Sequence, residues 1–454
     1  MPRRIAAAVL VAVEAGRGTA RDLLDAAIRG RDLDPRDRDL VREIAYGAIR
    51  RGITLDRLLE ALSTRRLRTL PPGVRAALRV GAYQVLFLDR VPAAAAVNAA
   101  VAEARDAGGG RDAGYVNAIL RELARQVEGR PEGDGDDRPR QSVPTGDGRH
   151  VRLHRALLPS PAKDGTGLLA ARWSVPRWLV QRWLTTHGTE ATAQILRASA
   201  ARPGTWLRPL PGKAEALRTA LSSKEVAFEE DGDPPGFLLR GAGAVEDLPG
   251  YREGLFVVQD PAAARAVLLL APRPGESILE VGAGRGGKTA FLAQAVAPGG
   301  RVLSVDRDGA RLALLRETLA RTAAPPCVVE VVEGDALADG VLPSGPFDRV
   351  LVDAPCSNTG VLARRVEARH RVQPQDLEAL AALGRRLLEA ALDRLRPGGT
   401  AVHSVCSLEP EEGPDTVRRA IRKRPEHSIV EEELLLPVPG RRDGGYAAVL
   451  RRAP

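Results

Sequence analysis

The chain has 454 residues, 44% of them hydrophobic and 28% charged, a composition that excludes wholesale disorder and a scaffold held together by disulfides. At roughly 150 residues per domain, this length predicts two or three packed domains. The three cysteines are too few and too widely spaced for a disulfide framework, which is typical of a reducing compartment. We expect a cytoplasmic protein, because Glu14 interrupts the apolar N-terminal run and no stretch of about 18 apolar residues follows.

The basic surplus of the chain is unevenly distributed. Lys and Arg number 67 against 58 Asp and Glu, a formal net charge of +9. Residues 1–128 hold 22 Arg and 16 acidic residues, whereas residues 254–454 hold 27 basic and 26 acidic residues. A basic surplus is typical of proteins that bind polyanions such as RNA. An Arg-rich and Ala-rich composition is also typical of a GC-rich genome, so both explanations remain open at this point.

Residues 1–128 show the three- and four-residue spacing of apolar positions that predicts helices. The positions that set this spacing are Leu40, Val41, Ile44, Ala45, Ala48, Ile49, Val74, Leu78, Ala82, Val85, Leu86, Val97 and Val101. We expect an all-α bundle, with loops or first helical turns at Pro71-Pro72-Gly73 and Pro92. Residues 129–150 are rich in Gly, Pro, Asp and Arg with few apolar residues, and they predict a flexible linker.

Residues 151–253 predict a small helical and α+β connecting region. Trp173, Trp178 and Trp183 lie five residues apart, and Pro176 is placed to open a helix. Evenly spaced Trp residues can stack on bases, but aromatic residues in a helix near a domain junction more often belong to the core, and we favour the core. A helix near 213–221 and a short strand at GFLLR complete this region.

From residue 254 to residue 454, short apolar strands alternate with helices, a rhythm that predicts a doubly wound parallel sheet. The predicted strands cover 277–281, 301–305, 327–332, 349–352 and 400–405, and the predicted helices lie near 288–296, 308–321, 375–395 and 414–424. Ligands of such sheets bind at the carboxyl ends of the strands. The residues directly after each strand are therefore the candidates for a functional site.

A glycine-rich loop, EVGAGRGGKT, comes at the end of the first of these strands. Gly282, Gly284 and Gly287 fit the pattern G-x-G-x-x-G, in which glycines allow a tight turn and a close approach to a nucleotide-like ligand. The same loop ends in Gly-Lys-Thr and also fits the phosphate-binding pattern G-x-x-x-x-G-K-T, with Asp353 as the matching magnesium-holding carboxylate. An NTPase is therefore a rival hypothesis.

Acidic residues end the next two strands. Asp306 lies about twenty residues past the loop, where a carboxylate can accept hydrogen bonds from ribose hydroxyls, and Asp335 follows the third strand. Several carboxylates near a triphosphate would repel it, so these acids favour an adenosine ligand without phosphates. S-adenosylmethionine is such a ligand, and its positive sulfonium suits an acidic site.

Two of the three cysteines follow adjacent strands of the predicted sheet. Cys356 lies in DAPCSNTG after the fourth strand and Cys406 in SVCSLEPEE after the fifth, so both fall at the ligand-binding edge. Cys327, early in a strand, is interpreted as structural. The six His residues show no ligand spacing with the cysteines, so no metal site is expected.

The two cysteine segments resemble the paired cysteine motifs of bacterial RNA cytosine-5 methyltransferases, and GRGGKT resembles the end of their cofactor loop. In residues 1–128, RDRDLVREIAYGAIR, LRVGAYQVLFLDRVPAAAAVNAAV and GYVNAILREL resemble the NusB-like domain of the RsmB type. GLFVVQDPAAA and SVPRWLVQRW extend the resemblance over nearly the whole chain. It implies a multidomain fold: an all-α NusB-like bundle, a small α+β unit and an α/β Rossmann-like methyltransferase domain.

The resemblance also implies an activity, the transfer of a methyl group from S-adenosylmethionine to carbon 5 of a cytidine in small-subunit ribosomal RNA. Carbon 5 is a poor nucleophile until a thiolate adds to carbon 6, and the family implies Cys406 as that nucleophile. Cys356 is implied in product release, and Asp353 in contacts with the ring's N3 and exocyclic amine. The positions that match the family's cofactor contacts are Gly282, Ala283, Gly284, Arg285, Gly286, Gly287, Lys288, Asp306, Asp335 and Asp353.

Two segments depart from the family's pattern. Its cofactor loop usually reads D-x-C-A-A-P-G-G-K-T, whereas Gly282, Gly284 and Arg285 replace the Cys, the second Ala and the Pro here. After Cys356, the family's R-R-x-P-D/E-x-R/K-W pattern is shortened to RRVEARHR, without Pro or Trp. We expect Arg365, Arg369 and Arg371 in this segment to contact RNA phosphates.

Three hypotheses of different classes follow. The favoured one is a monomeric ribosomal RNA cytosine-5 methyltransferase with no membrane association. The second is a P-loop NTPase that acts on RNA, whose magnesium-dependent hydrolysis would survive the loss of both thiols. The third is a catalytically inactive RNA-binding factor in ribosome assembly, which would need neither cofactor nor cysteine.

Overall fold

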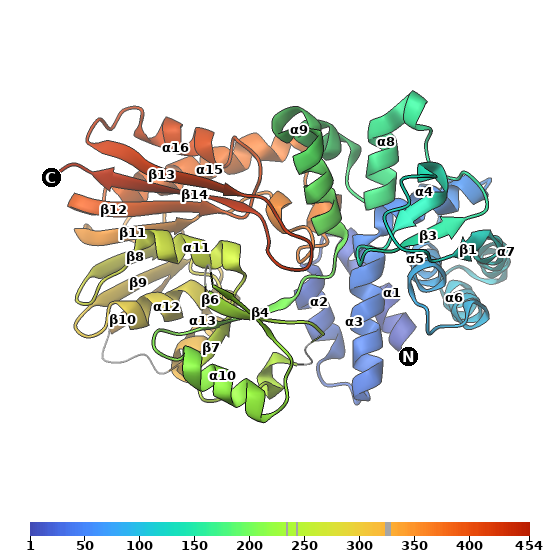
Figure 1. The fold of residues 1–454 in the computed structure, drawn as a ribbon, viewed down its shortest axis with the longest axis horizontal. Coiled ribbons are helices and arrows are strands. Elements are labelled where there is room, and N and C mark those ends of the chain that lie inside the picture. The colour runs from blue at the N-terminus through green and yellow to red at the C-terminus, as the bar shows by residue number, and fades with distance from the viewer. Residues whose placement is uncertain (233–234, 242–243, 323–327) are drawn as a thin grey trace. The chain divides into compact units, whose positions relative to one another are not determined.

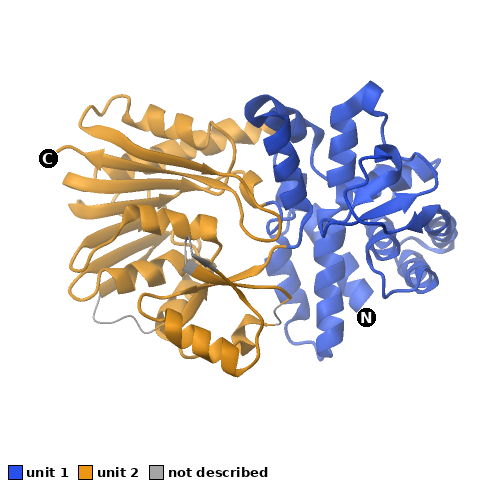
Figure 2. Cartoon of the chain, in the orientation of Figure 1, with its two compact units in different colours: residues 1–202, 362–372 blue, residues 203–361, 373–454 orange. Residues whose placement is uncertain are grey.

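The computed structural model describes residues 1–232, 235–241, 244–322 and 328–454, which form two compact units (Figures 1 and 2). Unit 1 comprises residues 1–202 and 362–372, and unit 2 comprises residues 203–361 and 373–454. The boundaries differ from the predicted ones, because the connecting region 151–253 is divided between the units. The chain also leaves unit 2 after residue 361 and returns to it at residue 373.

The N-terminal part of unit 1 is the predicted helical bundle. Its helices are α1 (Pro2–Glu14), α2 (Ala20–Ile28), α3 (Pro35–Arg50), α4 (Gly52–Leu62), α5 (Pro72–Phe87), α6 (Ala93–Gly108) and α7 (Gly110–Gln126), with a 3₁₀ turn η1 at Leu67–Thr69. Asp34 caps α3 by accepting a hydrogen bond from the amide of Arg36, and Pro35 occupies the first turn. Val41, Ile44 and Ala48 are fully buried, which confirms the helical spacing read from the sequence.

Residues 129–150, predicted as a flexible linker, are instead folded. Strands β1 (Val127–Gly129), β2 (Ser142–Pro144) and β3 (His150–Leu153) form an antiparallel sheet in the order β1-β3-β2, with a 3₁₀ turn η2 at Pro139–Gln141. Val143 of this segment, together with Val151 and Leu153 of β3, is completely buried in the core of the bundle. Three apolar anchors on paired strands are enough to order a segment that composition alone assigns to a linker.

The acidic residues of the same segment are paired with arginines. Asp134 bonds Arg197 at 2.7 Å, Asp136 bonds Arg172 at 2.8 Å and Asp137 bonds Arg152 at 2.9 Å. The composition therefore predicted a solvated linker where the structure holds a network of ion pairs.

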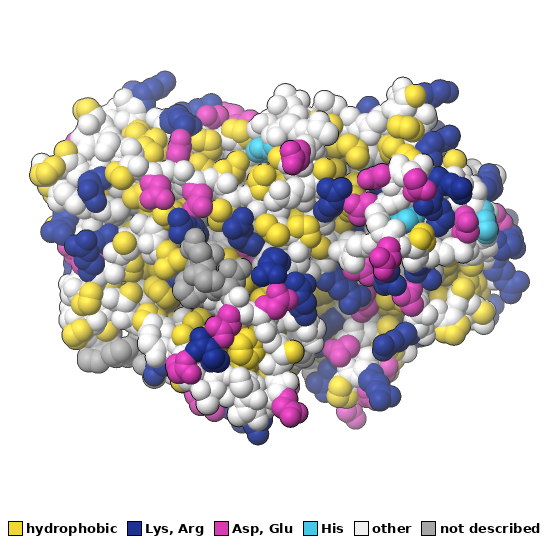
Figure 3. Space-filling model, in the orientation of Figure 1, with side chains coloured by type: hydrophobic (Ala, Val, Ile, Leu, Met, Phe, Trp, Pro, Cys, Tyr) yellow, Lys and Arg dark blue, Asp and Glu magenta, His cyan; other side chains and the backbone are white. Residues whose placement is uncertain are grey.

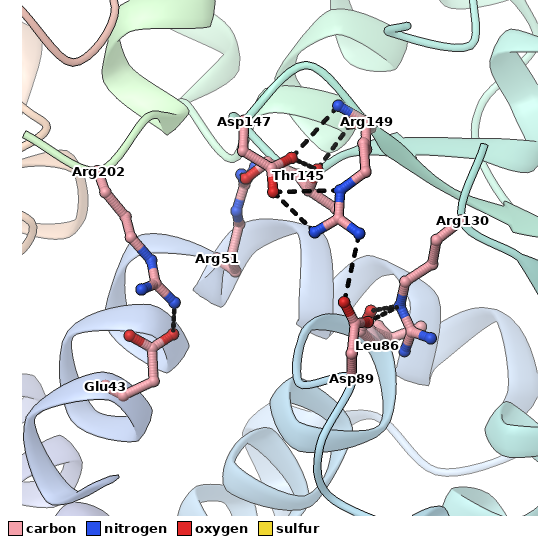
Figure 4. Close-up of polar contacts among 9 residues, drawn as sticks. All are labelled: Glu43, Arg51, Leu86, Asp89, Arg130, Thr145, Asp147, Arg149 and Arg202. Atoms are coloured by element: carbon pink, nitrogen blue, oxygen red, sulfur yellow. Dashed lines mark hydrogen bonds and ion pairs between the residues drawn. The ribbon is translucent and has the colours of Figure 1, made fainter. Parts of the chain in front are cut away.

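A second group of ion pairs links the segment to the bundle (Figure 4). Arg149 bonds both Asp147 at 2.9 Å and Asp89 at 3.3 Å, and Arg130 reaches the same Asp89 at 2.9 Å. Because Asp89 follows α5, these contacts hold the sheet against that end of the bundle.

Unit 1 is completed by α8 (Pro161–Trp173), α9 (Arg177–Ala200) and the short helix α14 (Ala368–Arg371). Pro176 precedes the first residue of α9, as expected for a helix start. Trp173 and Trp183 are buried, which agrees with a core role, and Trp178 is partly buried.

The first part of unit 2 is a four-stranded sheet in the order β5-β6-β4-β7. Its elements are β4 (Thr205–Pro209), α10 (Ala214–Ser223), β5 (Glu229–Gly232), β6 (Pro235–Leu239), the 3₁₀ turn η3 (Val245–Asp247) and β7 (Phe256–Val258). Helix α10 and strand β6 confirm the helix and the strand that the sequence predicts here.

The main sheet of unit 2 has seven strands in the order β10-β9-β8-β11-β12-β14-β13 (Figure 1). The strands are β8 (Ser277–Val281), β9 (Arg301–Asp306), β10 (Val328–Glu333), β11 (Phe347–Asp353), β12 (Leu395–Val405), β13 (His427–Leu435) and β14 (Gly445–Arg452). The first five are parallel, and β14 and β13 add an antiparallel edge that the sequence analysis did not predict. The order reverses at β8, so ligands are expected at the carboxyl ends of β8 and β11.

Helices cover both faces of this sheet (Figure 1). They are α11 (Pro261–Leu270), α12 (Gly287–Ala295), α13 (Gly309–Thr322), α15 (Pro374–Leu392) and α16 (Pro414–Ile421), with a 3₁₀ turn η4 at Thr359–Val361. Alternate strand residues divide between the faces: Leu351 packs in the cluster that holds residues of α11, and Val350 packs with α15 and α16. The sheet is thus buried on both sides, which explains its continuous apolar strands.

None of the helices in the described ranges combines the length and the apolar composition needed to cross a membrane. On the face shown in Figure 3, basic and acidic side chains are interspersed. Cys327 lies outside the described residues, so its structural interpretation stays a prediction.

Candidate active site

The glycine-rich loop joins β8 to α12 at the point where the strand order reverses. Gly282, Gly284 and Gly286 have positive φ angles of 84°, 57° and 82°. A Cβ atom at Gly282 would lie 2.2 Å from the carbonyl oxygen of Asp353, so only glycine allows β8 and β11 to approach this closely. The loop keeps its tight turn without the family's usual Cys, Ala and Pro.

Asp306, at the end of β9, fixes the loop from the neighbouring strand. Its Oδ2 accepts a hydrogen bond from the amide of Gly284 at 2.8 Å, and its Oδ1 accepts one from the amide of Asp308 at 3.0 Å. Asp335, after β10, is exposed and accepts a hydrogen bond from the amide of Leu337 at 2.9 Å. Both predicted acids therefore stand at the same edge of the sheet.

Lys288 and Asp353 form an ion pair at the centre of this edge. Lys288 Nζ lies 2.6 Å from Asp353 Oδ2. Burial opposes the charged form of the lysine, but the Asp353 carboxylate outweighs this effect, so the pKa of Lys288 is raised. The pair places a cation and a carboxylate side by side at the end of β11.

Glu280 is a buried acid beneath the loop that the sequence analysis did not single out as a site residue. It is fully buried at the end of β8, and its Oε2 accepts hydrogen bonds from Thr289 Oγ1 at 2.6 Å and from Ser304 Oγ at 2.7 Å. Burial raises the pKa of Glu280 to about 7. The threonine of the phosphate-binding pattern is thus bound to an acid, as is its lysine.

Cys356 and Cys406, fifty residues apart, are brought into contact. Their Sγ atoms lie 3.2 Å apart at the ends of β11 and β12. The hydrogen bond with Cys406, together with burial, raises the pKa of the Cys356 thiol well above its usual value. The contact brings the two thiols within reach of one reacting atom.

The loops that carry the cysteines are held together by further hydrogen bonds. Asn358, at a positive φ of 62°, accepts a hydrogen bond from Cys406 Sγ at 3.3 Å and donates one to the carbonyl of Cys356 at 2.8 Å. The amide of Gly360 donates to the carbonyl of Cys406 at 3.1 Å. The sequence signal for Asn358 was its place in DAPCSNTG, but nothing in that motif predicted its conformation.

A cavity of about 180 Å³ opens beside Cys406, directly after β12, within unit 2. Lys288, Asp353 and Cys406 line one part of it. Asp260, Arg265 and other residues of α11, β13 and β14 line the remainder. The predicted cofactor-loop lysine, strand-end acid and cysteine therefore face a common space.

The arginines predicted to contact RNA belong to unit 1 and have different surroundings. Arg369 is 2% exposed, and its guanidinium donates to the backbone carbonyls of Arg50, Ser174, Ser199 and Leu362 at 2.7–3.0 Å. A phosphate contact by Arg369 is incompatible with this burial, and the expectation is corrected: the residue is a structural anchor.

Arg365 and Arg371 are the other two arginines predicted to contact RNA. Arg371 donates to the carbonyls of Val13, at 3.1 Å, and Gly18, so it also serves the fold of unit 1. Arg365 is partly exposed and keeps the role of a candidate phosphate contact. The charge of the segment predicted three arginines that contact RNA, but two of them donate hydrogen bonds to backbone carbonyls of the protein instead.

The chemistry of the site fits an adenosyl ligand better than a triphosphate. Asp306, Asp335 and Asp353 lie at the ends of neighbouring strands around the glycine loop. Lys288, which would hold phosphates in a P-loop, is paired with Asp353 instead. Together with the doubly wound sheet, this arrangement is that of a Rossmann-like methyltransferase that uses S-adenosylmethionine.

Comparisons with known proteins agree with this class. The family model "16S rRNA methyltransferase RsmB/F" matches residues 267–441, and that of the NusB family matches residues 1–125. The chain is 32% identical over 404 residues to a probable ribosomal RNA small subunit methyltransferase B of Synechocystis sp., covering 88% of this chain and 84% of that protein. It is also 32% identical over 433 residues to the ribosomal RNA small subunit methyltransferase B of Vibrio cholerae, covering 92% and 90%.

Solved structures give the same result for the fold. The crystal structure of PH0851 superposes with a TM-score of 0.76, at 21% identity, over 100% of this chain and 99% of that one. A methyltransferase homolog protein from Pyrococcus horikoshii gives a TM-score of 0.56, at 26% identity, over 65% of this chain and 100% of that one. The chain belongs to the RsmB/F family of ribosomal RNA methyltransferases, and its cofactor is S-adenosylmethionine.

Proposed function

We propose that this methyltransferase modifies carbon 5 of a cytidine in small-subunit ribosomal RNA through a covalent adduct on Cys406. The observation that carries the proposal is the 3.2 Å contact between Cys356 and Cys406 beside the ion pair of Lys288 and Asp353. Methylation of a nucleophilic oxygen or amine needs no thiol, whereas carbon 5 of cytosine must first be activated by addition at carbon 6. Two thiols at one site match that requirement.

The protonation of the two thiols supports different roles for them. Because the hydrogen bond with Cys406 and burial raise the pKa of Cys356, that thiol keeps its proton when the pair carries one charge. Cys406, unlike Cys356, is among the residues that line the cavity where a base can enter. Cys406 is thus the nucleophile, and Cys356 stands next to it as a proton-bearing partner.

The chain's own residues account for the activation of the base. Cys406 Sγ forms a bond to carbon 6, and the electron pair of the C5–C6 double bond moves away from carbon 6, so that carbon 5 becomes nucleophilic. Asp353 faces the N3 and exocyclic amine edge, where its carboxylate, fixed by Lys288, accepts a hydrogen bond from the amine and orients the ring. S-adenosylmethionine, when bound, supplies an electrophilic methyl group on its sulfonium.

Release of the product reverses the addition. Once carbon 5 is methylated, its proton leaves to a base, the C5–C6 double bond re-forms and the S–C6 electron pair returns to Cys406 as a thiolate. Cys356, held in contact with that sulfur, assists the departure by hydrogen bonding to it. The cytosine must leave any base stack to reach the cavity, at least cost from a single-stranded region.

Glycine-loop residues and strand-end acids hold the cofactor in this proposal. Gly282 to Lys288 form the turn, and Asp306 and Asp335 provide carboxylates for the ribose and adenine edges. The helical unit and Arg365 contribute to binding of the RNA backbone.

The test is transfer of labelled methyl from S-adenosylmethionine to deproteinised small-subunit RNA that lacks the modification, followed by nucleoside analysis. We expect the label in 5-methylcytidine. Label in another nucleoside would overturn the carbon 5 chemistry while keeping the family activity. RNA binding without any transfer would favour the inactive assembly factor instead.

A further inference from the structure

A buried carboxylate joins the two cysteine loops behind the thiols. Glu412 lies in the turn between β12 and α16 and is 2% exposed. Its Oε1 accepts a hydrogen bond from the amide of Ser357 at 2.8 Å, and its Oε2 accepts one from Ser357 Oγ at 2.6 Å. Ser357 directly follows Cys356, so the carboxylate grips the loop of that thiol through both oxygens.

The same cluster reaches the loop of Cys406. Ser407, the residue after Cys406, is fully buried, and its hydroxyl lies 3.1 Å from that of Ser357. Thr359 Oγ1 lies 3.2 Å from Ser407 Oγ and accepts a hydrogen bond from the amide of Leu408 at 3.0 Å. One carboxylate and three hydroxyls therefore connect the residues that follow each cysteine.

The position of Glu412 is itself fixed by its own turn. Its amide and that of Gly413 both donate to the carbonyl of Glu409 at 3.2 Å, and its carbonyl accepts a hydrogen bond from His403 Nε2 at 3.1 Å. His403 is fully buried on β12, and burial lowers its pKa, so it is a neutral donor here. The backbone of Glu412 is therefore held by the strand that precedes Cys406.

The charge of Glu412 also acts on the nearer thiol. Its negative charge adds to the hydrogen bond with Cys406 and to burial in raising the pKa of Cys356. Burial raises the pKa of Glu412, while the hydrogen bonds from Ser357 and Ser407 favour its charged form. The negative charge of neighbouring Glu409 also raises the pKa of Glu412.

We propose that Glu412 is a positioning residue that holds the two cysteine loops in register and places a negative charge on the side of Cys356, so that Cys406 takes the nucleophile's role. This inference rests on the proposed function for the roles of the two thiols. Glu412 is not among the residues that line the cavity beside Cys406, and it acts through Ser357 and Ser407. Without its charge, the pKa of Cys356 falls and the spacing of the two sulfurs loosens.

The first experiment measures thiol acidity without RNA. In a Cys406→Ser background, the pH dependence of Cys356 alkylation by iodoacetamide is followed by mass spectrometry of its peptide. We expect Glu412→Gln to move the alkylation midpoint to lower pH, because a nearby negative charge has been removed. Glu378→Gln, the same change at an exposed residue of α15, should leave the midpoint unchanged. An unshifted midpoint in Glu412→Gln would overturn the proposal.

A second variant separates charge from geometry. Ser357→Ala keeps the Glu412 carboxylate but removes the 2.6 Å hydrogen bond, so the alkylation midpoint should not fall. If thermal unfolding shows that Glu412→Gln does not fold, Ser357→Ala tests whether Glu412 positions the cysteine loops. An unchanged kcat in Ser357→Ala would then contradict it.

The third readout is turnover in the chain with both cysteines. Glu412→Gln should lower kcat by about tenfold or more and change the KM for S-adenosylmethionine by less than about twofold, since positioning of the thiols is affected and cofactor binding is not. Denaturation-resistant RNA–protein complex should accumulate, because release by Cys356 is impaired. Wild-type protein that forms no 5-methylcytidine would refute the proposed function alone, as the alkylation result is obtained without RNA.

Discussion

Arg369 in unit 1 and Asp353 in unit 2 are held by different kinds of partner. Arg369 is surrounded by backbone carbonyls, which accept hydrogen bonds from its guanidinium. Asp353 instead meets a second full charge, Lys288, at the edge of a cavity. A guanidinium whose N–H groups all donate to carbonyls has no donor left for a ligand. An ion pair that lines a cavity can exchange partners during a reaction.

The largest effect should come from the thiols at the site. Cys406→Ala should lower turnover by at least about a thousandfold and form no covalent complex, because the nucleophile is lost. Cys356→Ala should retain RNA as a denaturation-resistant adduct on Cys406. Gel electrophoresis under denaturing conditions with labelled RNA distinguishes the two. A trapped complex in the Cys406 variant would reverse the assignment.

The second prediction concerns the arginines of residues 362–372. Arg369→Ala should lower the free energy of unfolding by about 3 kcal/mol, because several buried carbonyls lose their donor. Arg365→Ala, at a partly exposed neighbour, should leave stability nearly unchanged and weaken RNA binding modestly. Denaturant unfolding and RNA titration at fixed salt provide the two measurements. Equal stability losses for both variants would remove the contrast between a structural and a binding arginine.

The third prediction uses the pH dependence of the acid beneath the glycine loop. The pKa of Glu280 is about 7 in the folded chain and near 4.5 when unfolded, so the native state binds more protons between these values. The free energy of unfolding should therefore fall as pH rises from about 4.5 to 7, by at most about 3 kcal/mol. Glu280→Gln should flatten this part of the profile, measured by denaturant unfolding at several pH values. A parallel profile in the variant would contradict the buried-acid interpretation.

The smallest effect is expected in the segment predicted as a linker. Asp134→Asn weakens a partly exposed ion pair with Arg197, worth about 0.5 kcal/mol. Cleavage within residues 129–150 by a nonspecific protease should become about twofold faster, because opening is slightly more frequent. Asp106→Asn, which removes an exposed ion pair elsewhere in unit 1, serves as the control. Rapid cleavage of this segment in the wild-type protein would instead support the prediction that residues 129–150 form a flexible linker.

Features with a strict geometric rule could be predicted from the sequence. The recurrence of apolar residues every 3.6 positions predicted the helical bundle. The alternation of strands and helices predicted the parallel part of the main sheet. Because parallel strands end at one edge, Cys356 and Cys406 could be expected near each other although fifty residues separate them. The rule gives the edge of the sheet but not the 3.2 Å distance between the sulfurs.

Features that depend on partners distant in the sequence could not be predicted. The role of Arg369 is set by carbonyls of residues 50, 174 and 199, and nothing local marks it as buried. The ordering of residues 129–150 depends on arginines such as Arg172 and Arg197 from later helices. Glu412 was visible only as one of several acids after Cys406, and its contact with Ser357 requires two loops to meet.

Unit 1 is completed by residues that are made late in synthesis. Val366 is fully buried in the core of the bundle, and Arg369 ties α3, α8 and α9 together through their carbonyls. A ribosome releases residues 1–202 and then strands β4 to β11 before it reaches this segment. The N-terminal unit therefore cannot finish folding as an independent first step, and the nascent chain must keep a vacant position in the bundle until most of the catalytic unit has emerged.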